Sequence, residues 1–254
     1  MRKIFLNGSK TIHWVNYGLR TSSPEGQLMS NYIEVMAIVE GKTEQIFIEK
    51  MLQPYLAEKM IFISATQVSK PGQKGGDVRF SRVKKDIEMH LKQRPTTYVT
   101  TFIDYYGTNE WPGLETLNRH WEPKQIAEHL HLSTQNEVRQ FLPAQRVDER
   151  FIPYIVMHEF EALLFSDKEI LANELNIDEQ EVEQVLQECR EPESINNSPQ
   201  TAPSKRLGKW SANGVFAKTT TGIAIAEKIG IPKMREKCPL FDEWLHKLEI
   251  LITI

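Results

Sequence analysis

The apolar residues of the chain fall into short runs of strand length that alternate with segments of helical periodicity. In the helical segments apolar side chains recur three or four positions apart, as at Val83, Ile87 and Leu91, so one face of each helix is expected to be buried. The sequence predicts strands over residues 33–39, 61–66, 98–103 and 151–157, and helices from Thr43, around residues 83–91 and over residues 123–132. Pro54 is expected to end or kink the first helix, and residues 70–76 are typical of a flexible loop.

Beyond residue 168 the pattern is helical. Helices are expected over residues 179–189, 221–229 and 240–251, and residues 192–213 are typical of a long polar loop. Strands that alternate with helices favour an α/β fold, with a mostly parallel sheet flanked by helices and a helical C-terminal part. We divide the chain into a core of residues 29–167 and a helical region of residues 168–254 packed on it.

The first 28 residues differ from the rest, and two interpretations of them remain open. Residues 21–27 have the composition of a loop, and Met29 stands just before the first strong strand. Translation from Met29 would leave residues 1–28 as an N-terminal extension. Alternatively, residues 1–28 form a hairpin that turns at Asn7 and Gly8.

Composition narrows the class of protein. No apolar run approaches the roughly 18 residues that a membrane-spanning helix needs, so no membrane partner is expected. The two cysteines, Cys189 and Cys238, suit free thiols in a reducing compartment, which predicts a cytoplasmic protein. A net charge of −3 provides no general attraction for nucleic acid, so any such contact must be local or made through metal ions.

Carboxylates follow the predicted strands at the points where the strands end. Glu40 follows the first strand, Asp104 the third, and Glu159 and Glu161 the fourth. Ligands of parallel sheets bind beyond the carboxyl ends of the strands, so these acids are expected to share one crevice. Ionised carboxylates in a small site need a cation, and oxygen ligands suit Mg²⁺ or Mn²⁺. We predict that these acids form a catalytic metal site.

Each of these residues also has a simpler interpretation. Glu40 or Glu44 can merely favour a helix N-terminus through the helix dipole, and Asp104 can be a turn residue. Glu159 and Glu161 can be ordinary acids of a first helical turn. His158, beside them, is either a substrate contact or a hydrogen-bonded core histidine. The placement of all these acids at strand ends is what favours a metal site over the simpler interpretations.

Several segments resemble known families. Val39-Glu-Gly-Lys-Thr-Glu44 resembles the first TOPRIM motif, in which a strand ends in Glu-Gly before a helix. More closely, the chain from residue 33 to about residue 250 resembles the bacterial family called domain of unknown function 4276. The matching segments are residues 39–44, 102–107, 150–154, 158–167 and 202–207.

The resemblance implies a TOPRIM-like fold related to the overcoming-lysogenization-defect type of TOPRIM nuclease. It implies that Glu40 is the TOPRIM glutamate and Asp104 the first aspartate of the Asp-x-Asp motif. Tyr106 stands where the second aspartate belongs, and we hypothesise that Glu159 or Glu161 replaces it. Members of the family are often encoded beside ATPases of phage-defence type, which implies an ATPase partner.

Basic and aromatic residues supply candidate substrate contacts. Lys205, Arg206 and Lys218 belong to a basic, partly aromatic cluster that could neutralise phosphates, although a solvated surface loop has the same composition. Lys74 lies in a Gly-rich loop that does not fit the Walker pattern, so no ATP hydrolysis is expected. Tyr106 is either a substrate-stacking residue or an aromatic residue on the rim of the site.

Three functions compete on these observations. The first is a magnesium-dependent nuclease that hydrolyses phosphodiester bonds of DNA or RNA, as the effector of an ATPase partner. The second is a catalytically degenerate TOPRIM-like module that binds nucleic acid or a partner protein, which Tyr106 favours. The third is a phosphoesterase that acts on small molecules.

Overall fold

The protein is described by a computed structural model that covers residues 32–70, 73–74, 78–196 and 198–253. These residues belong to one compact unit, residues 31–254. The two interpretations of residues 1–28, and the question of a start at Met29, therefore lie outside the described residues.

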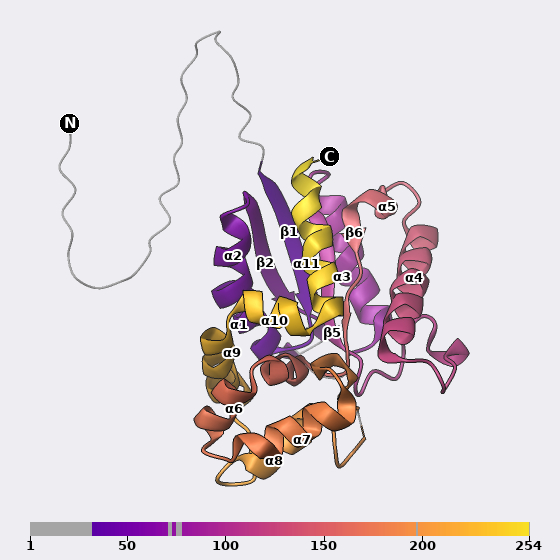
Figure 1. Ribbon diagram of the computed structural model, residues 1–254. Coiled ribbons are helices and arrows are strands. Elements are labelled where there is room, and N and C mark those ends of the chain that lie inside the picture. The colour runs from indigo at the N-terminus through magenta and orange to yellow at the C-terminus, as the bar shows by residue number, and fades with distance from the viewer. Residues whose placement is uncertain (1–31, 71–72, 75–77, 197, 254) are drawn as a thin grey trace, which may run out of the picture. The chain divides into compact units, whose positions relative to one another are not determined.

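A mostly parallel sheet forms the centre of the fold (Figure 1). Strand β1 (Ile33–Val39) lies between β2 (Ile61–Gln67) and β5 (Tyr98–Asp104), and β6 (Phe151–Ile152) and β7 (Ile155–Val156) pair with the far side of β5. All of these pairs are parallel. The predicted α/β class is confirmed, and the carboxyl ends of the strands face the same way.

The predicted strand over residues 151–157 is instead two short strands, separated by Pro153 and Tyr154. Pro153 has no N–H to donate to a ladder. At Tyr154 the side chain of Thr101 takes the place of the backbone hydrogen bonds between strands. Its Oγ1 accepts from the N–H of Tyr154 and donates to the carbonyl oxygen of Tyr154, both at 2.9 Å. β6 and β7 therefore both stay attached to β5, at Val99↔Phe151 and Ile103↔Ile155.

Helices cover both faces of the sheet, as the continuous apolar strands require. On one face, the ring of Phe102 packs against Phe47 of helix α1 (Lys42–Phe47) and Trp244 of α11 (Pro239–Glu249). Figure 1 shows α11 in front of the sheet and α3 (Phe80–Gln93) behind it. The expected buried stripe of α3 is confirmed: Val83, Ile87 and Leu91 are buried.

The first helix passes Pro54 instead of ending there. Helix α1 continues through a π-helical segment, η1 (Ile48–Leu52), into α2 (Gln53–Ala57). Pro54 directly follows the π-helical turn, in which the N–H of Gln53 bonds to the carbonyl oxygen of Ile48.

The expectation of a polar loop over residues 192–213 is wrong. This segment contains the 3₁₀ turn η4 (Pro192–Ser194) and helix α8 (Pro203–Trp210). Pro203 is the first residue of α8, and the side chain of Leu207 is buried. The carboxylate of Glu159 accepts a hydrogen bond from the N–H of Ser204 in the first turn of the helix. The residues described near position 70 form a small antiparallel pair, β3 (Ser69–Lys70) with β4 (Gln73–Lys74), where a loop was expected.

The remaining helices surround this core. They are η2 (Leu114–Thr116), α4 (Pro123–Phe141), α5 (Val147–Arg150), η3 (Phe160–Ser166), α6 (Lys168–Leu175), α7 (Glu179–Cys189), η5 (Lys218–Gly222), α9 (Ile223–Ile229), α10 (Ile231–Lys237) and η6 (Ile250–Thr253). The expected helix over residues 123–132 continues to Phe141, and α7 has the expected bounds. In the described part of the chain, no helix combines the length and the apolar character needed to cross a membrane.

Candidate active site

Three of the four predicted acids meet beyond the carboxyl ends of the strands. Glu40 directly follows β1, Asp104 is the last residue of β5, and Glu161 lies in η3, shortly after β7. Their charges act on one another, since Glu40 and Glu161 both contribute to the raised pKa of Asp104. The pairing of β1 and β7 with β5 therefore brings together acids that are far apart in the sequence.

Asp104 is the most central of these acids. Its side chain is buried, and its Oδ1 accepts a hydrogen bond of 2.9 Å from the N–H of Phe160. Burial raises its pKa well above the ordinary range, and the neighbouring charges of Glu44, Glu40 and Glu161 raise it further. The bond to Phe160 ties the start of η3 to the end of β5, which places Glu161 beside the other acids.

Glu161 is completely buried and faces a single ammonium group. Nζ of Lys218, the first residue of η5, lies 2.7 Å from Oε1 of Glu161. The two groups form an ion pair, and Oε2 of Glu161 has no hydrogen-bond partner among the described residues. Burial raises the pKa of Glu161, and the charge of Lys218 opposes that rise. Burial lowers the pKa of Lys218, but the carboxylates Glu161 and Asp104 outweigh it and keep the ammonium charged.

Glu44 belongs to the same cluster, although the sequence indicated it only as a helix N-terminal acid. It is buried one turn after Glu40, and its Oε2 accepts a 2.9 Å hydrogen bond from the N–H of Gly41. Burial raises the pKa of Glu40 to about 7, and the charge of Glu44 is the next cause. The spacing of four positions across a strand-to-helix turn was the signal that could have indicated a second acid here.

Glu159 lies near the cluster, since its charge acts on Glu161 and Lys218, but its carboxylate holds a helix. Its Oε2 accepts from the N–H of Ser204, and its Oε1 accepts from the hydroxyl of Ser204, both at 2.8 Å. Ser204 lies in the first turn of α8, so Glu159 satisfies a donor of that turn. Two of the segments that carry the family resemblance, residues 158–167 and 202–207, therefore contact each other through this pair.

His158 is a buried histidine beside the site. Its ring centroid lies 5.6 Å from that of Tyr105, and its carbonyl oxygen accepts a 2.8 Å hydrogen bond from the N–H of Tyr106. Burial lowers the pKa of the ring to about 4, so the ring is neutral at pH 7. Its Nδ1 has no hydrogen-bond partner among the described residues.

The predicted basic contacts are dispersed. Lys218 lies at the acids, whereas Lys205 is exposed on α8. The Nε atom of Arg206 donates to the carbonyl oxygen of Thr201 at 2.8 Å, so this side chain is bound to the segment just before α8. Lys74 lies in β4, and its side chain is outside the described part of the structure.

A comparison with models of protein families matches residues 39–249 to the family described as domain of unknown function (DUF4276). The chain belongs to this family. Glu40, Glu44, Asp104, Glu161 and Lys218 all lie within the family domain. The resemblance to this family that the motifs indicated is thereby confirmed. Neither a curated protein nor a solved structure matches the chain.

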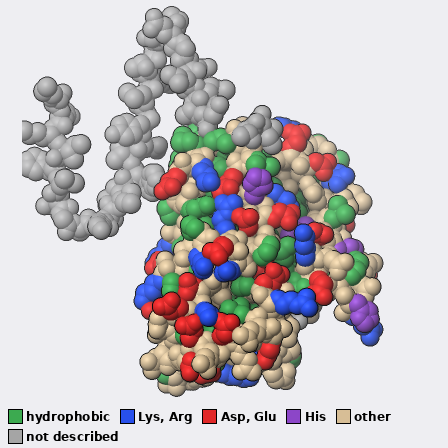
Figure 2. Space-filling model, in the orientation of Figure 1, with side chains coloured by type: hydrophobic (Ala, Val, Ile, Leu, Met, Phe, Trp, Pro, Cys, Tyr) green, Lys and Arg blue, Asp and Glu red, His purple; other side chains and the backbone are tan. Residues whose placement is uncertain are grey.

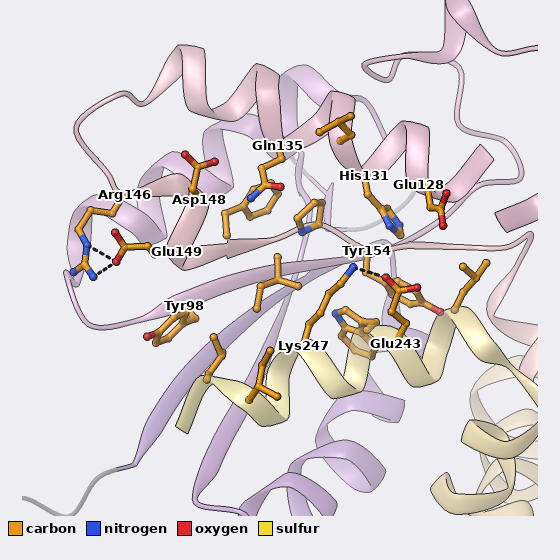
Figure 3. A pocket seen from close by; sticks show the side chains of 18 residues that line it. Tyr98, Glu128, His131, Gln135, Arg146, Asp148, Glu149, Tyr154, Glu243 and Lys247 are labelled. Carbon is orange, nitrogen blue, oxygen red and sulfur yellow. Dashed lines mark hydrogen bonds and ion pairs between the residues drawn. The ribbon is translucent and has the colours of Figure 1, made fainter. Parts of the chain in front are cut away.

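Two cavities of the family domain differ in their relation to the acids. A polar cavity of about 260 Å³ has Glu40 in its wall, together with Tyr106 from the loop after β5. A more apolar cavity of about 550 Å³ lies between α4 and α11, beside β6, and includes Phe151 and Trp244 (Figure 3). The second cavity contains none of the clustered acids, so the candidate chemistry belongs to the first.

The raised pKa of Glu40 should make the stability of the family domain depend on pH. Its pKa is about 7 in the folded state, against an ordinary value of 4.5. Between these values the folded protein keeps a proton that the unfolded chain has lost, so the free energy of unfolding falls as the pH rises, and no further above about pH 7. We expect urea unfolding in EDTA to show this fall between about pH 4.5 and pH 7. Glu40→Gln should reduce the fall, and an unchanged slope in this variant would contradict the assignment.

Proposed function

We propose that this chain is a divalent-metal-dependent nuclease that hydrolyses phosphodiester bonds of DNA or RNA. The observation that carries the proposal is the meeting of Glu40, Asp104 and Glu161 beside the ammonium of Lys218. Burial of several carboxylates in one place is unfavourable unless a cation compensates their charge. Groups with such raised pKa values are concentrated at functional sites, where their charge takes part in the chemistry.

The donor set suits Mg²⁺ or Mn²⁺. Glu40, Asp104 and Glu161 offer carboxylate oxygens, the hard ligands that these ions prefer, and Oε2 of Glu161 lacks a hydrogen-bond partner among the described residues. In the part of the chain that the structure describes, no group of three or more His, Cys, Asp or Glu side chains is already arranged to hold a metal ion. We expect waters and substrate oxygens to supply further ligands, as is usual for Mg²⁺. Once bound, the ion would act as a Lewis acid on the phosphate.

Two side chains of the site, Lys218 and Glu40, would also have roles besides metal ligation. The side chain of Lys218 is 42% exposed, and we expect its ammonium to contact a phosphate oxygen while it stays next to Glu161. Glu40 has a pKa of about 7, so it can accept or donate a proton near neutral pH. Together these residues would bind the phosphate and move the proton in hydrolysis.

The proposal includes a relation to TOPRIM nucleases and an ATPase partner in phage defence. The TOPRIM relation is supported by the motif resemblance of residues 39–44 and 102–107, and the ATPase partner by what the family resemblance implies; neither is supported by the fold class. Tyr106 stands at the position of the second TOPRIM aspartate, and Glu161 from the next segment would supply the missing carboxylate. Acidic and basic side chains are interspersed on the face shown in Figure 2, so we expect substrate contacts near the site rather than across this face.

Cleavage assays on the purified full chain test the function. Plasmid DNA, single-stranded DNA and RNA are incubated with the protein in Mg²⁺ or Mn²⁺, with EDTA and Glu40→Ala as controls. We expect cleavage that EDTA abolishes and that Glu40→Ala reduces by at least roughly 10²-fold. Binding of nucleic acid without cleavage, even with the ATPase partner present, would instead identify a binding module. Hydrolysis restricted to small phosphodiesters would identify a phosphoesterase.

A further inference from the structure

We infer that the cavity beside Glu40 is a subsite for one unpaired nucleotide, so that the substrate is single-stranded where it is cut. This inference rests on the proposed nuclease function and specifies its substrate. The cavity, called here the nucleotide cavity, is lined by Glu40, Arg79, Tyr106, Thr108, Asn109 and Glu110, with Val78 and Gly107.

The position of the nucleotide cavity ties it to the acids. Glu40 belongs both to its wall and to the acidic cluster. The loop that follows Asp104 supplies most of the other lining residues, from Tyr106 to Glu110. A phosphodiester at the acids carries a nucleotide on each side, and one of these nucleotides would enter the cavity next to Glu40.

The size and lining of the cavity favour one nucleotide over a base pair. Its volume is about 260 Å³. Pockets for drug-sized ligands start at roughly 300 Å³, so this cavity accommodates one base or sugar and leaves no room for a paired strand. The ring of Tyr106 offers a stacking surface, which is sequence-tolerant because every base has a π-face. Arg79 brings a positive charge suited to a backbone phosphate.

The remaining polar groups of the cavity leave acceptors available for a base. The side-chain amide of Asn109 donates through Nδ2 to the carbonyl oxygen of Gly107 at 3.0 Å, and its Oδ1 can accept from a base amino group. Glu110 is engaged elsewhere, because its Oε1 accepts from the N–H of Ser81 at 3.1 Å in the first turn of α3. The acid in this wall therefore contributes a hydrogen bond to the first turn of α3, and its charge lies near that of Arg79.

The loop that carries Tyr106 is fixed by its own hydrogen bonds. The N–H of Tyr106 donates to the carbonyl oxygen of His158 at 2.8 Å, and the hydroxyl of Thr108 donates to that of Asp104 at 2.7 Å. Gly107 has a φ of 84°, a left-handed conformation that favours glycine. A wall held in this way loses little freedom when a ligand binds. The geometry gives Tyr106 a role as a base-stacking residue at a position where TOPRIM proteins have an acid.

The test compares substrates and tyrosine variants. A fluorescent single-stranded oligonucleotide, the blunt duplex of the same sequence, and that duplex with an unpaired overhang are cleaved by wild type, Tyr106→Ala and Tyr106→Phe. Tyr32→Ala is the control, because Tyr32 is an exposed tyrosine at the start of β1, where it packs on Phe62. We expect the single strand to be cut at least about 10-fold faster than the blunt duplex. Tyr106→Ala should lose about 5- to 150-fold on the single strand, mainly through KM, and Tyr106→Phe should restore it.

The outcomes separate the subsite from the proposed function. If wild type cuts single strand and duplex equally and Tyr106→Ala changes neither rate, the subsite is wrong and the nuclease function stands. If no polymer is cut, the nuclease function is wrong for the isolated chain. In that case fluorescence anisotropy with a labelled single-stranded hexanucleotide decides the subsite. Weaker binding by Tyr106→Ala than by Tyr32→Ala supports it, and equal binding overturns it.

Discussion

Replacement of Asp104 by asparagine is expected to reduce metal-dependent cleavage by roughly 10²–10⁴-fold, the range for loss of a group that acts directly in the chemistry. The amide removes the charge that would bind a cation. It keeps an oxygen that can accept the 2.9 Å hydrogen bond from Phe160, so η3 should stay attached to β5. Single-turnover cleavage rates and thermal unfolding, measured on the same preparation, check both parts of the prediction.

The stability of the Asp104→Asn variant distinguishes a catalytic role from a structural one. Burial and the neighbouring acids disfavour the charge of Asp104, so its removal should leave the melting temperature unchanged or raise it. Glu159→Gln is the matched control, because Glu159 is an equally buried acid that holds Ser204. It should lose about 1 kcal/mol of stability, as a lost helix cap does, and less than tenfold in rate. A large fall in the melting temperature of Asp104→Asn, or full activity, would contradict the assignment.

Replacement of Arg150 by methionine is expected to lower the free energy of unfolding by about 3–5 kcal/mol, as loss of a buried charged hydrogen-bonding group does. The side chain of Arg150 is buried, and its guanidinium donates only to backbone carbonyl oxygens in the bonds that the structure shows. These carbonyls belong to Leu91, Arg94, Thr97 and Gln145, at 2.5–3.3 Å. One side chain thereby joins the end of α3, the start of β5 and the segment before α5. Methionine has similar length but leaves these carbonyls without their donor.

Urea unfolding of Arg150→Met, with Arg150→Lys alongside, measures this effect. Lysine should recover only part of the loss, because a single ammonium cannot reproduce the planar fork of arginine. Arg150 precedes the strand that pairs with the start of β5, whereas Asp104 is at the other end of β5. Cleavage by the folded fraction should therefore be nearly unchanged. A loss below about 1 kcal/mol would show that water satisfies these carbonyls.

The order of strands along the chain could be predicted from the sequence because burial on both faces produces uninterrupted apolar runs. The run at residues 33–39 gave the bounds of β1, and the run at residues 98–103 located β5. The convergence of Glu40, Asp104 and Glu161 followed from the same pattern, since parallel strands end at one edge of a sheet. Helix α8 was not predicted because most of its residues are polar and its buried stripe, which includes Leu207, is too short to show helical periodicity.

The sequence by itself determined which residue types stand at the carboxyl edge of the sheet, because strand periodicity and strand ends are local properties of the chain. Only the tertiary structure decided what each acid does. Glu159 and Glu161 are two positions apart at the start of a 3₁₀ turn, yet their carboxylates have different partners. One meets Ser204 and the other meets Lys218, and both partners come from segments more than forty positions later in the chain. No local pattern carries that information, because each partner is brought there by the packing of α8 and η5 against η3.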